Sequence, residues 1–357
     1  PESTAVIDKE GNLYFGCHDG SFYSLDNHLR VRWTFGTASK IYGSPTLVGE
    51  RVIVASGDGN IYCFSLEGAL LWRDLFSPMK AGSMFAKLFK ASLSPYLTLL
   101  SRGVYFNDVG VIRSWSSVNV DSQNRVYITG SGVGLHSYSL ESGDLLYRYE
   151  LKGPRRHHLS GVTIDSEDRV YCCSQRRYLH CIIEGRTHWV FDSELNYDSW
   201  SSPSFDEENQ CLYATWTAGQ KTGVIICVDV FGAKKWSFRF PGGIRGTTVI
   251  CGKDRLVFCT HSGILYSVVR KTGEICWKKK LSSAKRACWS SPSVDVNGNI
   301  FVSIKLDFEN GAIFAFNRDG DELWSHNTGK VLCTPILDEK ARLYFGSFGG
   351  RYTCLQT

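Results

Sequence analysis

The chain has 357 residues, of which 43% are hydrophobic and 21% are charged, and its formal net charge is +5. This apolar content is sufficient for a large buried core, and the chain has no run of five or six like charges such as a nucleic-acid-binding arm would carry. Its apolar runs are much shorter than a membrane span, and it does not open on the basic, apolar and small-residue series of a signal peptide. We therefore expect a globular protein that binds no nucleic acid.

The thirteen cysteines do not have the pattern of a disulfide framework. Several lie within strand-like apolar runs and are expected to act as small core residues, namely Cys63, Cys181, Cys227, Cys259 and Cys354. No C-x-x-C pair and no His/Cys cluster has zinc-ligand spacing, so we expect no metal site. The absence of an Asn-x-Ser/Thr acceptor favours a reducing, cytoplasmic location.

One pattern of strands repeats along the whole chain: a strand, a tight glycine turn, a second strand, a polar turn, and a third strand ending in an aromatic residue. The eight units are residues 11–35, 50–74, 124–149, 168–191, 210–238, 254–279, 299–325 and 341–355. Their closing aromatics are Trp33, Trp72, Tyr147, Trp189, Trp236, Trp277 and Trp324. Neighbouring aromatics are 39 to 47 residues apart, except for one gap of 75.

A further short segment precedes the units and reads as a fourth strand, as in "STAVID", "GSPTLV", "SSPSFD", "SSPSVD" and "CTPILD". Four-stranded repeats of this length predict a β-propeller, because a single such sheet cannot bury both of its faces without neighbours. We therefore predict one all-β domain over residues 1–357, an eight-bladed β-propeller of four-stranded antiparallel blades. Because residues 3–8 already supply the first strand of blade one, the last blade should have three strands.

The long gap places an insertion between blades two and three, at residues 76–113. Residues 79–100 have helical spacing up to Pro95, with Met84, Leu88 and Ala91 on one face and Lys80, Lys87 and Lys90 away from it. A connection this long in a compact domain commonly forms a lid or a partner-binding element. We predict a lid here, and the basic amphipathic character leaves contact with a membrane surface open.

The repeat resembles that of the pyrroloquinoline-quinone (PQQ)-type, quinoprotein-like or BamB-like, eight-bladed propellers. The resemblance rests on small-Ser-Pro, then Leu-Tyr-x-Gly, then Gly-x-Leu-Tyr-x-Leu, then Gly-x-x-x-Trp, and it covers nearly the whole chain. It implies the propeller fold and leaves function open, because the family includes quinoprotein dehydrogenases and outer-membrane assembly scaffolds.

In a propeller of this kind the connection between successive blades opens on one mouth of the central channel. The position two residues before the second small residue of each connection should face that mouth. It is occupied by Glu2, Tyr42, Trp115, Leu159, Trp200, Arg245, Trp289 and Leu332. A purely structural tryptophan should recur in most blades, so Trp115, Trp200 and Trp289 are candidate ligand-binding residues, although packing between blades is the alternative.

Polar residues of the same connections suggest how a ligand would be held. Arg245 is the candidate inward clamp for an anion or a polarised carbonyl, and Asp198 and His157 are the acid/base candidates. The remaining candidate ligand-binding residues are Tyr42, Arg113 and Lys330. A solvated polar rim is the alternative interpretation of all these side chains.

The leading hypothesis for function is a monomeric propeller that binds a small apolar or aromatic molecule, including an anionic one, and that could be a cofactor-independent acid/base enzyme. The alternative is a protein-interaction scaffold of the BamB kind. A third, PQQ-dependent dehydrogenase activity, is disfavoured: the resemblance would give Cys172 and Cys173 the role of the vicinal disulfide above PQQ, but they align with the end of a strand. We expect no cofactor.

Overall fold

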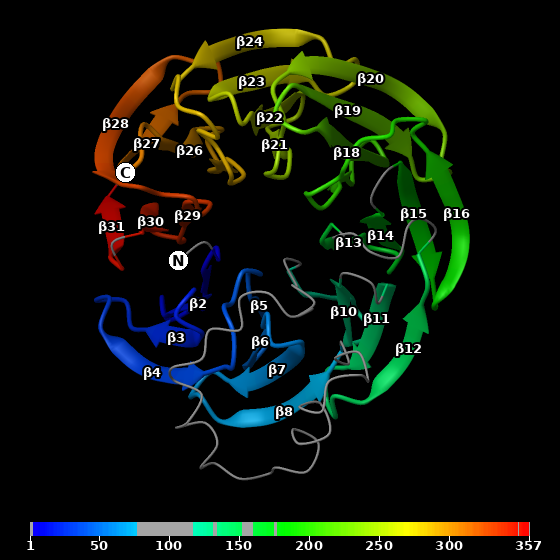
Figure 1. Cartoon of the computed structure of the whole chain (residues 1–357), viewed down its shortest axis with the longest axis vertical. Coiled ribbons are helices and arrows are strands. Elements are labelled where there is room, and N and C mark those ends of the chain that lie inside the picture. Colours follow the sequence, from blue (N-terminus) through cyan, green and yellow to red (C-terminus); the bar gives the residue numbers. More distant parts are fainter. Residues whose placement is uncertain are drawn as a thin grey trace.

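In the computed structural model the strands form a closed ring of eight antiparallel sheets around a central channel (Figure 1). The structure describes residues 3–76, 117–130, 134–151, 160–174, 177–348 and 350–356, and it contains no helix in these ranges. Seven blades have four strands and the last has three, so the sequence-based prediction of the fold, including the short last blade, is confirmed. Among the described residues no helix has the length and apolarity of a membrane span.

The first four blades follow one another in chain order. Blade one contains β1 (Val6–Ile7), β2 (Leu13–Gly16), β3 (Ser21–Leu25) and β4 (Val31–Gly36). Blade two contains β5 (Thr46–Val48), β6 (Arg51–Ala55), β7 (Asn60–Ser65) and β8 (Leu70–Leu75). Blade three contains β9 (Asn119–Val120), β10 (Arg125–Gly130), β11 (Gly134–Ser139) and β12 (Leu145–Tyr149). Blade four contains β13 (Val162–Ile164), β14 (Val170–Cys173), β15 (Tyr178–Ile183) and β16 (Arg186–Asp192).

The remaining blades complete the ring and bring blade eight against blade one. Blade five contains β17 (Ser204–Asp206), β18 (Cys211–Ala218), β19 (Thr222–Asp229) and β20 (Lys234–Pro241). Blade six contains β21 (Val249–Cys251), β22 (Arg255–Cys259), β23 (Ile264–Val269) and β24 (Ile275–Lys280). Blade seven contains β25 (Ser293–Val294), β26 (Ile300–Lys305), β27 (Asn310–Phe316) and β28 (Glu322–Gly329). Blade eight contains β29 (Ile336–Leu337), β30 (Arg342–Gly346) and β31 (Tyr352–Gln356).

An aspartate at the end of the innermost strand fixes the first turn in many blades. In blade one the Asp8 carboxylate accepts the backbone N–H of Asn12 at 2.7 Å and the hydroxyl of Tyr14 at 2.8 Å. The same tyrosine-to-aspartate bond recurs in blades three, four, five and eight, at Tyr127–Asp121, Tyr171–Asp165, Tyr213–Asp206 and Tyr344–Asp338. This contact explains the repeated Tyr of the second strand, because its buried hydroxyl needs a partner.

Neighbouring blades are joined by an aromatic ring laid over a glycine. The Trp236 ring on β20 covers Gly273 in the last turn of blade six, and its indole N–H donates to the carbonyl of Arg270 at 3.2 Å. The other tryptophan–glycine pairs are Trp33–Gly68, Trp72–Gly143, Trp189–Gly232 and Trp277–Gly320, and Tyr147 covers Gly185 in the same way. All of these glycines have positive φ angles. These closing aromatics are thus contacts between neighbouring blades.

Blade one departs from this rule at the position that corresponds to Gly68. It has Leu29 there, with φ of 64°. The described part of blade eight has no fourth strand that could place a ring on this turn, and the Leu29 side chain packs instead against the core shared by blades eight and one. That core also contains the stacked rings of Phe15 and Tyr352, 4.6 Å apart.

The predicted lid lies outside the described residues, except for its first residue. Phe76 is completely buried and packs with Trp72 and Val118 in the core between blades two and three. Phe76 therefore packs into the propeller core at the point where the predicted insertion begins. Its aromatic ring is buried there because the neighbouring side chains of this core are apolar.

The aromatic–glycine contact predicts how blade six responds to a single added carbon. A Cβ at Gly273 would lie 2.6 Å from the Trp236 ring, whereas Gly219, which also has positive φ, has no atom within 4 Å of that position. We expect Gly273→Ala to lower the free energy of unfolding by about 2–4 kcal/mol, through overpacking added to the backbone cost, and Gly219→Ala by about 1 kcal/mol. Urea denaturation of both variants measures this, and equal losses would contradict the role assigned to Gly273.

Candidate functional site at the channel mouth

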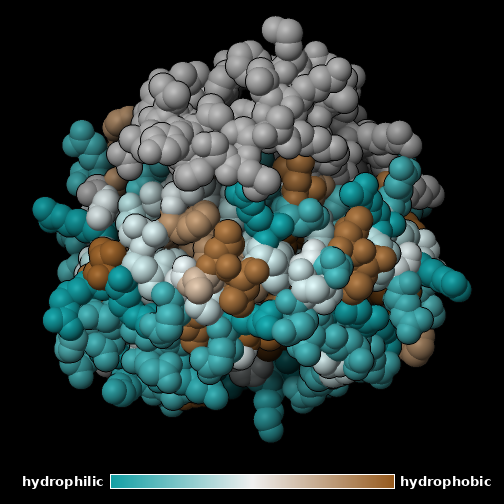
Figure 2. All heavy atoms as spheres, turned by 90° about the horizontal axis from the view of Figure 1, so that it is seen from below, coloured by the Kyte–Doolittle hydropathy of each residue, from teal (hydrophilic) through white to brown (hydrophobic). Residues whose placement is uncertain are grey.

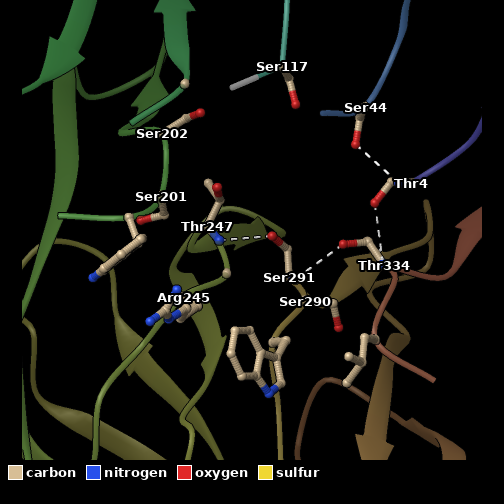
Figure 3. Close-up of a pocket in the computed structure, with 15 residues that line it drawn as sticks. Thr4, Ser44, Ser117, Ser201, Ser202, Arg245, Thr247, Ser290, Ser291 and Thr334 are labelled. Carbon is tan, nitrogen blue, oxygen red and sulfur yellow. Dashed lines mark hydrogen bonds between the residues drawn. The ribbon is translucent and has the colours of Figure 1, made fainter. Parts of the chain in front are cut away.

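A collar of small polar residues surrounds one mouth of the channel, where each innermost strand is about to begin. A pocket of about 180 Å³ lies inside this collar. Every blade contributes to its lining, through Thr4, Ser44, Ser117, Gly161, Ser202, Thr247, Ser291 and Thr334 (Figure 3). These are the second residues of the "small-Ser-Pro" segments, so the repeat itself places them in a ring.

Hydrogen bonds run around this collar in one direction. The backbone N–H of Thr247 donates to the Ser291 hydroxyl at 2.8 Å, and that of Ser291 donates to the Thr334 hydroxyl at 3.2 Å. The Thr334 N–H donates to Thr4 at 3.3 Å, and the Thr4 N–H to Ser44 at 3.1 Å, which closes the ring between blades eight and one. These four hydroxyls accept through a lone pair, and a hydroxyl that accepts in this way can still donate its proton to a further acceptor.

Above the collar, Arg245 lies between two tryptophans. Its guanidinium carbon is 3.8 Å from the centre of the Trp200 ring and 4.8 Å from that of Trp289. All three side chains line the pocket, and they come from the connections into blades five, six and seven. Stacking of a guanidinium on indole faces is favourable and leaves the N–H edge of the guanidinium available for a ligand.

The backbone around these side chains is fixed by the adjoining blades. Ile244 is buried and exchanges two 3.1 Å hydrogen bonds with the Thr217 hydroxyl, which holds the residue before Arg245 in place. The connection that carries Trp289 is bound on both sides, because Ala287 donates to the carbonyl of His261 at 2.8 Å and accepts from Lys305 at 2.7 Å. The mouth is therefore built on a rigid base.

Arg245 has no carboxylate partner among the described residues, although its charge is partly removed from water. Its Nε is buried without a hydrogen-bond partner. Burial and the positive charge of Arg286 lower the pKa of Arg245, and the negative charge of Asp198 opposes them in part. Buried polar groups are normally hydrogen-bonded, so a buried Nε without a partner in the described ranges makes this mouth a candidate site for an external acceptor.

His261 is a second unpartnered group at this mouth, and it was missed by the sequence reasoning. Its side chain is only 3% exposed, and neither ring nitrogen has a hydrogen-bond partner among the described residues. The ring packs against Trp289 with centroids 5.2 Å apart. Burial, together with the charges of Arg245 and Arg286, lowers the pKa of His261 to about 4. The signal was present in "CTHSG", because the turn between the second and third strands opens on the same mouth as the connections.

Two other predicted residues lie in a separate cation–aromatic cluster of the rim. The ammonium of Lys330 is 4.3 Å from the centre of the Phe348 ring and 5.6 Å from that of Phe308. Tyr42 packs edge-on against His18, at 4.7 Å between ring centres. Neither Lys330 nor Tyr42 lines the pocket beside Arg245.

The structure thus brings together three of the predicted site residues, Trp200, Arg245 and Trp289, with Asp198 on the connection that carries Trp200. The backbone of Asp198 is bound to Thr217 by hydrogen bonds of 3.0 and 2.7 Å. The predicted residues Arg113, Trp115 and His157 lie outside the described residues. Their roles stay predictions.

Further along the channel the wall changes from polar to apolar. A second hollow of about 550 Å³ touches the innermost strands of blades eight, one, two and three. It is lined by residues that include Val6, Ile7, Leu47, Val118, Ile336 and Leu337. Ser117 borders both hollows, so the collar leads into this apolar section.

The residues present do not fit the cofactor that the fold family suggests. Cys172 and Cys173 are free, fully buried thiols in β14, and they belong to the cores on opposite sides of blade four, so they do not cover the mouth. Within the described ranges no three His, Cys, Asp or Glu side chains are grouped as metal ligands. We derive no chemistry through PQQ.

Comparison with known proteins assigns the family. The sequence model described as "Outer membrane protein assembly factor BamB" matches residues 2–189, 135–304 and 221–357 in overlapping segments. The chain belongs to this family. A polyvinylalcohol dehydrogenase from Pseudomonas sp is similar over 130 residues at 26% identity, which is 34% of the chain and only 20% of that relative.

Solved structures show the same fold at low sequence identity. The computationally designed protein Ika8 matches with a TM-score of 0.70 at 12% identity, over 100% of the chain and 97% of its own length. A europium-containing methanol dehydrogenase matches with a TM-score of 0.59 at 12% identity, over 84% and 72% of the two chains. BamB from Moraxella catarrhalis matches with a TM-score of 0.50 at 16% identity, over 99% and 84%.

The position of the mouth tryptophans predicts that they contribute little to stability. Neither Trp200 nor Trp289 belongs to a core cluster, whereas Trp236 packs against the core between blades five and six. We expect Trp236→Ala to cost about 3–5 kcal/mol of unfolding free energy through the cavity it leaves, and Trp200→Ala or Trp289→Ala about 1 kcal/mol through the lost cation–π contact. Thermal and urea unfolding of the three variants measures the difference. Equal destabilisation would assign the mouth tryptophans to the fold.

The buried imidazole predicts a pH dependence of stability. The pKa of His261 is about 4 in the folded protein and near 6.5 in an unfolded chain, so the unfolded state binds the proton more readily. The stability contribution is complete above pH 6.5 and is lost as pH falls towards 4. Over that range the free energy of unfolding of the wild-type protein should fall by up to about 1.4 kcal/mol per pH unit because of His261. His261→Gln should abolish this contribution, whereas His188→Gln, at an exposed position of β16, should leave it in place. Urea titrations at pH 7 and 4.5 test this, and parallel curves for wild type and His261→Gln would contradict it.

Proposed function

We propose that this propeller binds a small organic anion at the channel mouth, with the anionic group paired to Arg245. The observation that carries the proposal is the guanidinium held between Trp200 and Trp289 with a buried Nε that has no partner. A charged donor fixed in a partly dry site binds a carboxylate or similar group strongly, because the charge is already desolvated and oriented.

The shape and lining of the channel support a ligand with two different ends. The collar offers hydroxyl protons next to Arg245, which suits the oxygens of the anionic group. The indole faces and the apolar section beyond Ser117 suit a flat or short apolar part. The collar pocket is small for a ligand site, so we favour a molecule of the size of a substituted benzoate over a large cofactor.

Chemistry on the bound molecule would fall to Asp198, the described acid/base candidate at this mouth. Its backbone is fixed on Thr217, and its charge acts on Arg245. A carboxylate in this place can orient the guanidinium and can accept a proton from a ligand bound to it. The geometry of Arg245 supports the binding of an anion directly. Acid/base catalysis by Asp198 is a further step of the proposal that depends on this binding.

The test uses benzenesulfonate, whose charge does not titrate, and isothermal titration calorimetry. We expect wild-type protein to bind it, and Arg245→Met to weaken binding about 10- to 100-fold through the loss of charge-assisted hydrogen bonds. Arg286→Met is the matched control, since Arg286 is an exposed arginine that stacks on Trp289 at 5.8 Å, and it should change the affinity only a few-fold. Absence of binding to wild type, or equal effects of the two variants, would overturn the proposal.

A protein-interaction scaffold is the second candidate, favoured by apolar side chains on the outermost strands. Leu70, Leu71 and Leu75 on β8 are 40–45% exposed, and Leu145 and Leu146 on β12 are 37% and 48% exposed. Figure 2 views this side of the ring and shows apolar patches among polar side chains. If these side chains bind a protein, affinity purification of the wild-type chain should recover a stoichiometric partner. The double variant Leu71→Ser, Leu146→Ser should lose this partner. Equal recovery by the wild type and the double variant would contradict this function.

A further inference from the structure

Two buried polar groups at the mouth have no hydrogen-bond partner in the part of the chain that the structure describes, and both contact the same tryptophan. Trp289 packs against the guanidinium of Arg245 and against the imidazole of His261. The Nε of Arg245 and both ring nitrogens of His261 are buried without hydrogen bonds. Two such groups on one indole are unusual, because leaving even one buried donor unsatisfied costs on the order of 1–3 kcal/mol.

The surroundings of His261 are cationic. The charged and titratable groups of the elements around it are Arg245, Arg286, Lys280, Asp198, Cys259 and Cys288. Lys280 donates to the carbonyl of Ser262 next to the histidine, and the two thiols are buried in the core beneath. Only Asp198 is acidic, and it lies beside Arg245. A positive charge on His261 would therefore add a cation to a site that already has several.

An anion at Arg245 would change this balance. It would neutralise the guanidinium whose charge opposes protonation of His261, and it would place a negative charge near the imidazole. Burial also opposes protonation and is the larger cause of the low pKa, so the shift on binding is a partial one. Thermodynamic linkage then requires that a ligand which favours the protonated histidine binds more tightly as the pH falls.

We infer that the anionic ligand of this mouth is bound together with a proton that is taken up by His261. The inference rests on the proposed function, since it needs an anion at Arg245. It adds that the site is proton-coupled: His261 is a positioning and charge-balancing residue, and release of the ligand at higher pH accompanies loss of its proton. The ligand is accordingly one whose charge is retained at acidic pH, such as a sulfonate or the anion of a strong carboxylic acid.

The experiment measures proton uptake directly. Benzenesulfonate is titrated into the full chain at pH 5 in two buffers of different ionisation enthalpy, and the difference in observed heat gives the number of protons bound. We expect a substantial fraction of one proton at pH 5 and almost none at pH 7.5. The affinity should rise about threefold between pH 7.5 and 4.5, as expected for a pKa shift of about one unit from about 4. The ring carbons of His261, followed by NMR on ¹³C-histidine-labelled protein, should titrate at a higher pH when the sulfonate is bound.

Variants identify the residue that takes up the proton. His261→Gln should retain binding at pH 7.5 within a few-fold and should lose both the proton uptake and the pH dependence, whereas the exposed His188→Gln should keep both. Should His261→Gln fail to fold, the ¹³C titration of wild-type protein still decides the question.

The outcomes separate the two proposals. Binding that depends on Arg245 but takes up no proton, or uptake that persists in His261→Gln, overturns the role of His261 and leaves the proposed function intact. Failure of benzenesulfonate to bind at either pH overturns the proposed function, and the coupling with it.

Discussion

The fold depends on an aromatic ring at the end of blades one to six, which covers a glycine of the following blade. Trp33, Trp72, Trp189, Trp236 and Trp277 all make this contact and donate an indole hydrogen bond to a neighbouring carbonyl. The contact combines apolar burial with a satisfied polar atom, and only glycine leaves room for the ring. The contact lies on the outermost strands, at the outer edge of the propeller and away from the central channel.

Because stacking at the perimeter and the cores between blades hold the ring together, the connections at the mouth have few structural duties. Equivalent positions there can be Tyr42, Trp200, Arg245, Trp289 or Leu332 without a change of fold. The collar below them keeps small hydroxyl residues in most blades, and four of these hydroxyls accept the backbone N–H of the preceding blade. The side chains above it are the ones free to define a ligand, and this division explains why one family fold can serve different functions.

Most of the fold could be predicted from the sequence because each blade repeats the same physical requirements. The strand alternation, the glycine of the last turn and the closing tryptophan recur at regular spacing, and the short last blade followed from their count. Leu29 could not be understood in this way, since its side chain is permitted only where no ring covers the turn. Phe76 was assigned to the insertion because sequence spacing does not show that an apolar residue after β8 reaches the core.

The candidate site could be predicted only in part. Register in the repeat placed Trp200, Arg245 and Trp289 on one mouth, but it could not show that the guanidinium would lie between the two rings. His261 was missed because it lies in a different kind of turn, and because an unpartnered imidazole is recognised only when every neighbour is known. Tyr42 has the right register and Lys330 lies in the same kind of connection, yet both pack away from the pocket. Lys330 lies against the rings of Phe348 and Phe308.

The central claim is that Arg245 is held ready for an anion from outside the chain. A crystal structure of the protein with benzenesulfonate tests it most directly. The account predicts a sulfonate oxygen within hydrogen-bonding distance of the Arg245 guanidinium, with the ring of the ligand against an indole face or the apolar section of the channel. A sulfonate bound only at other basic residues, with Arg245 still unpaired between Trp200 and Trp289, would contradict it.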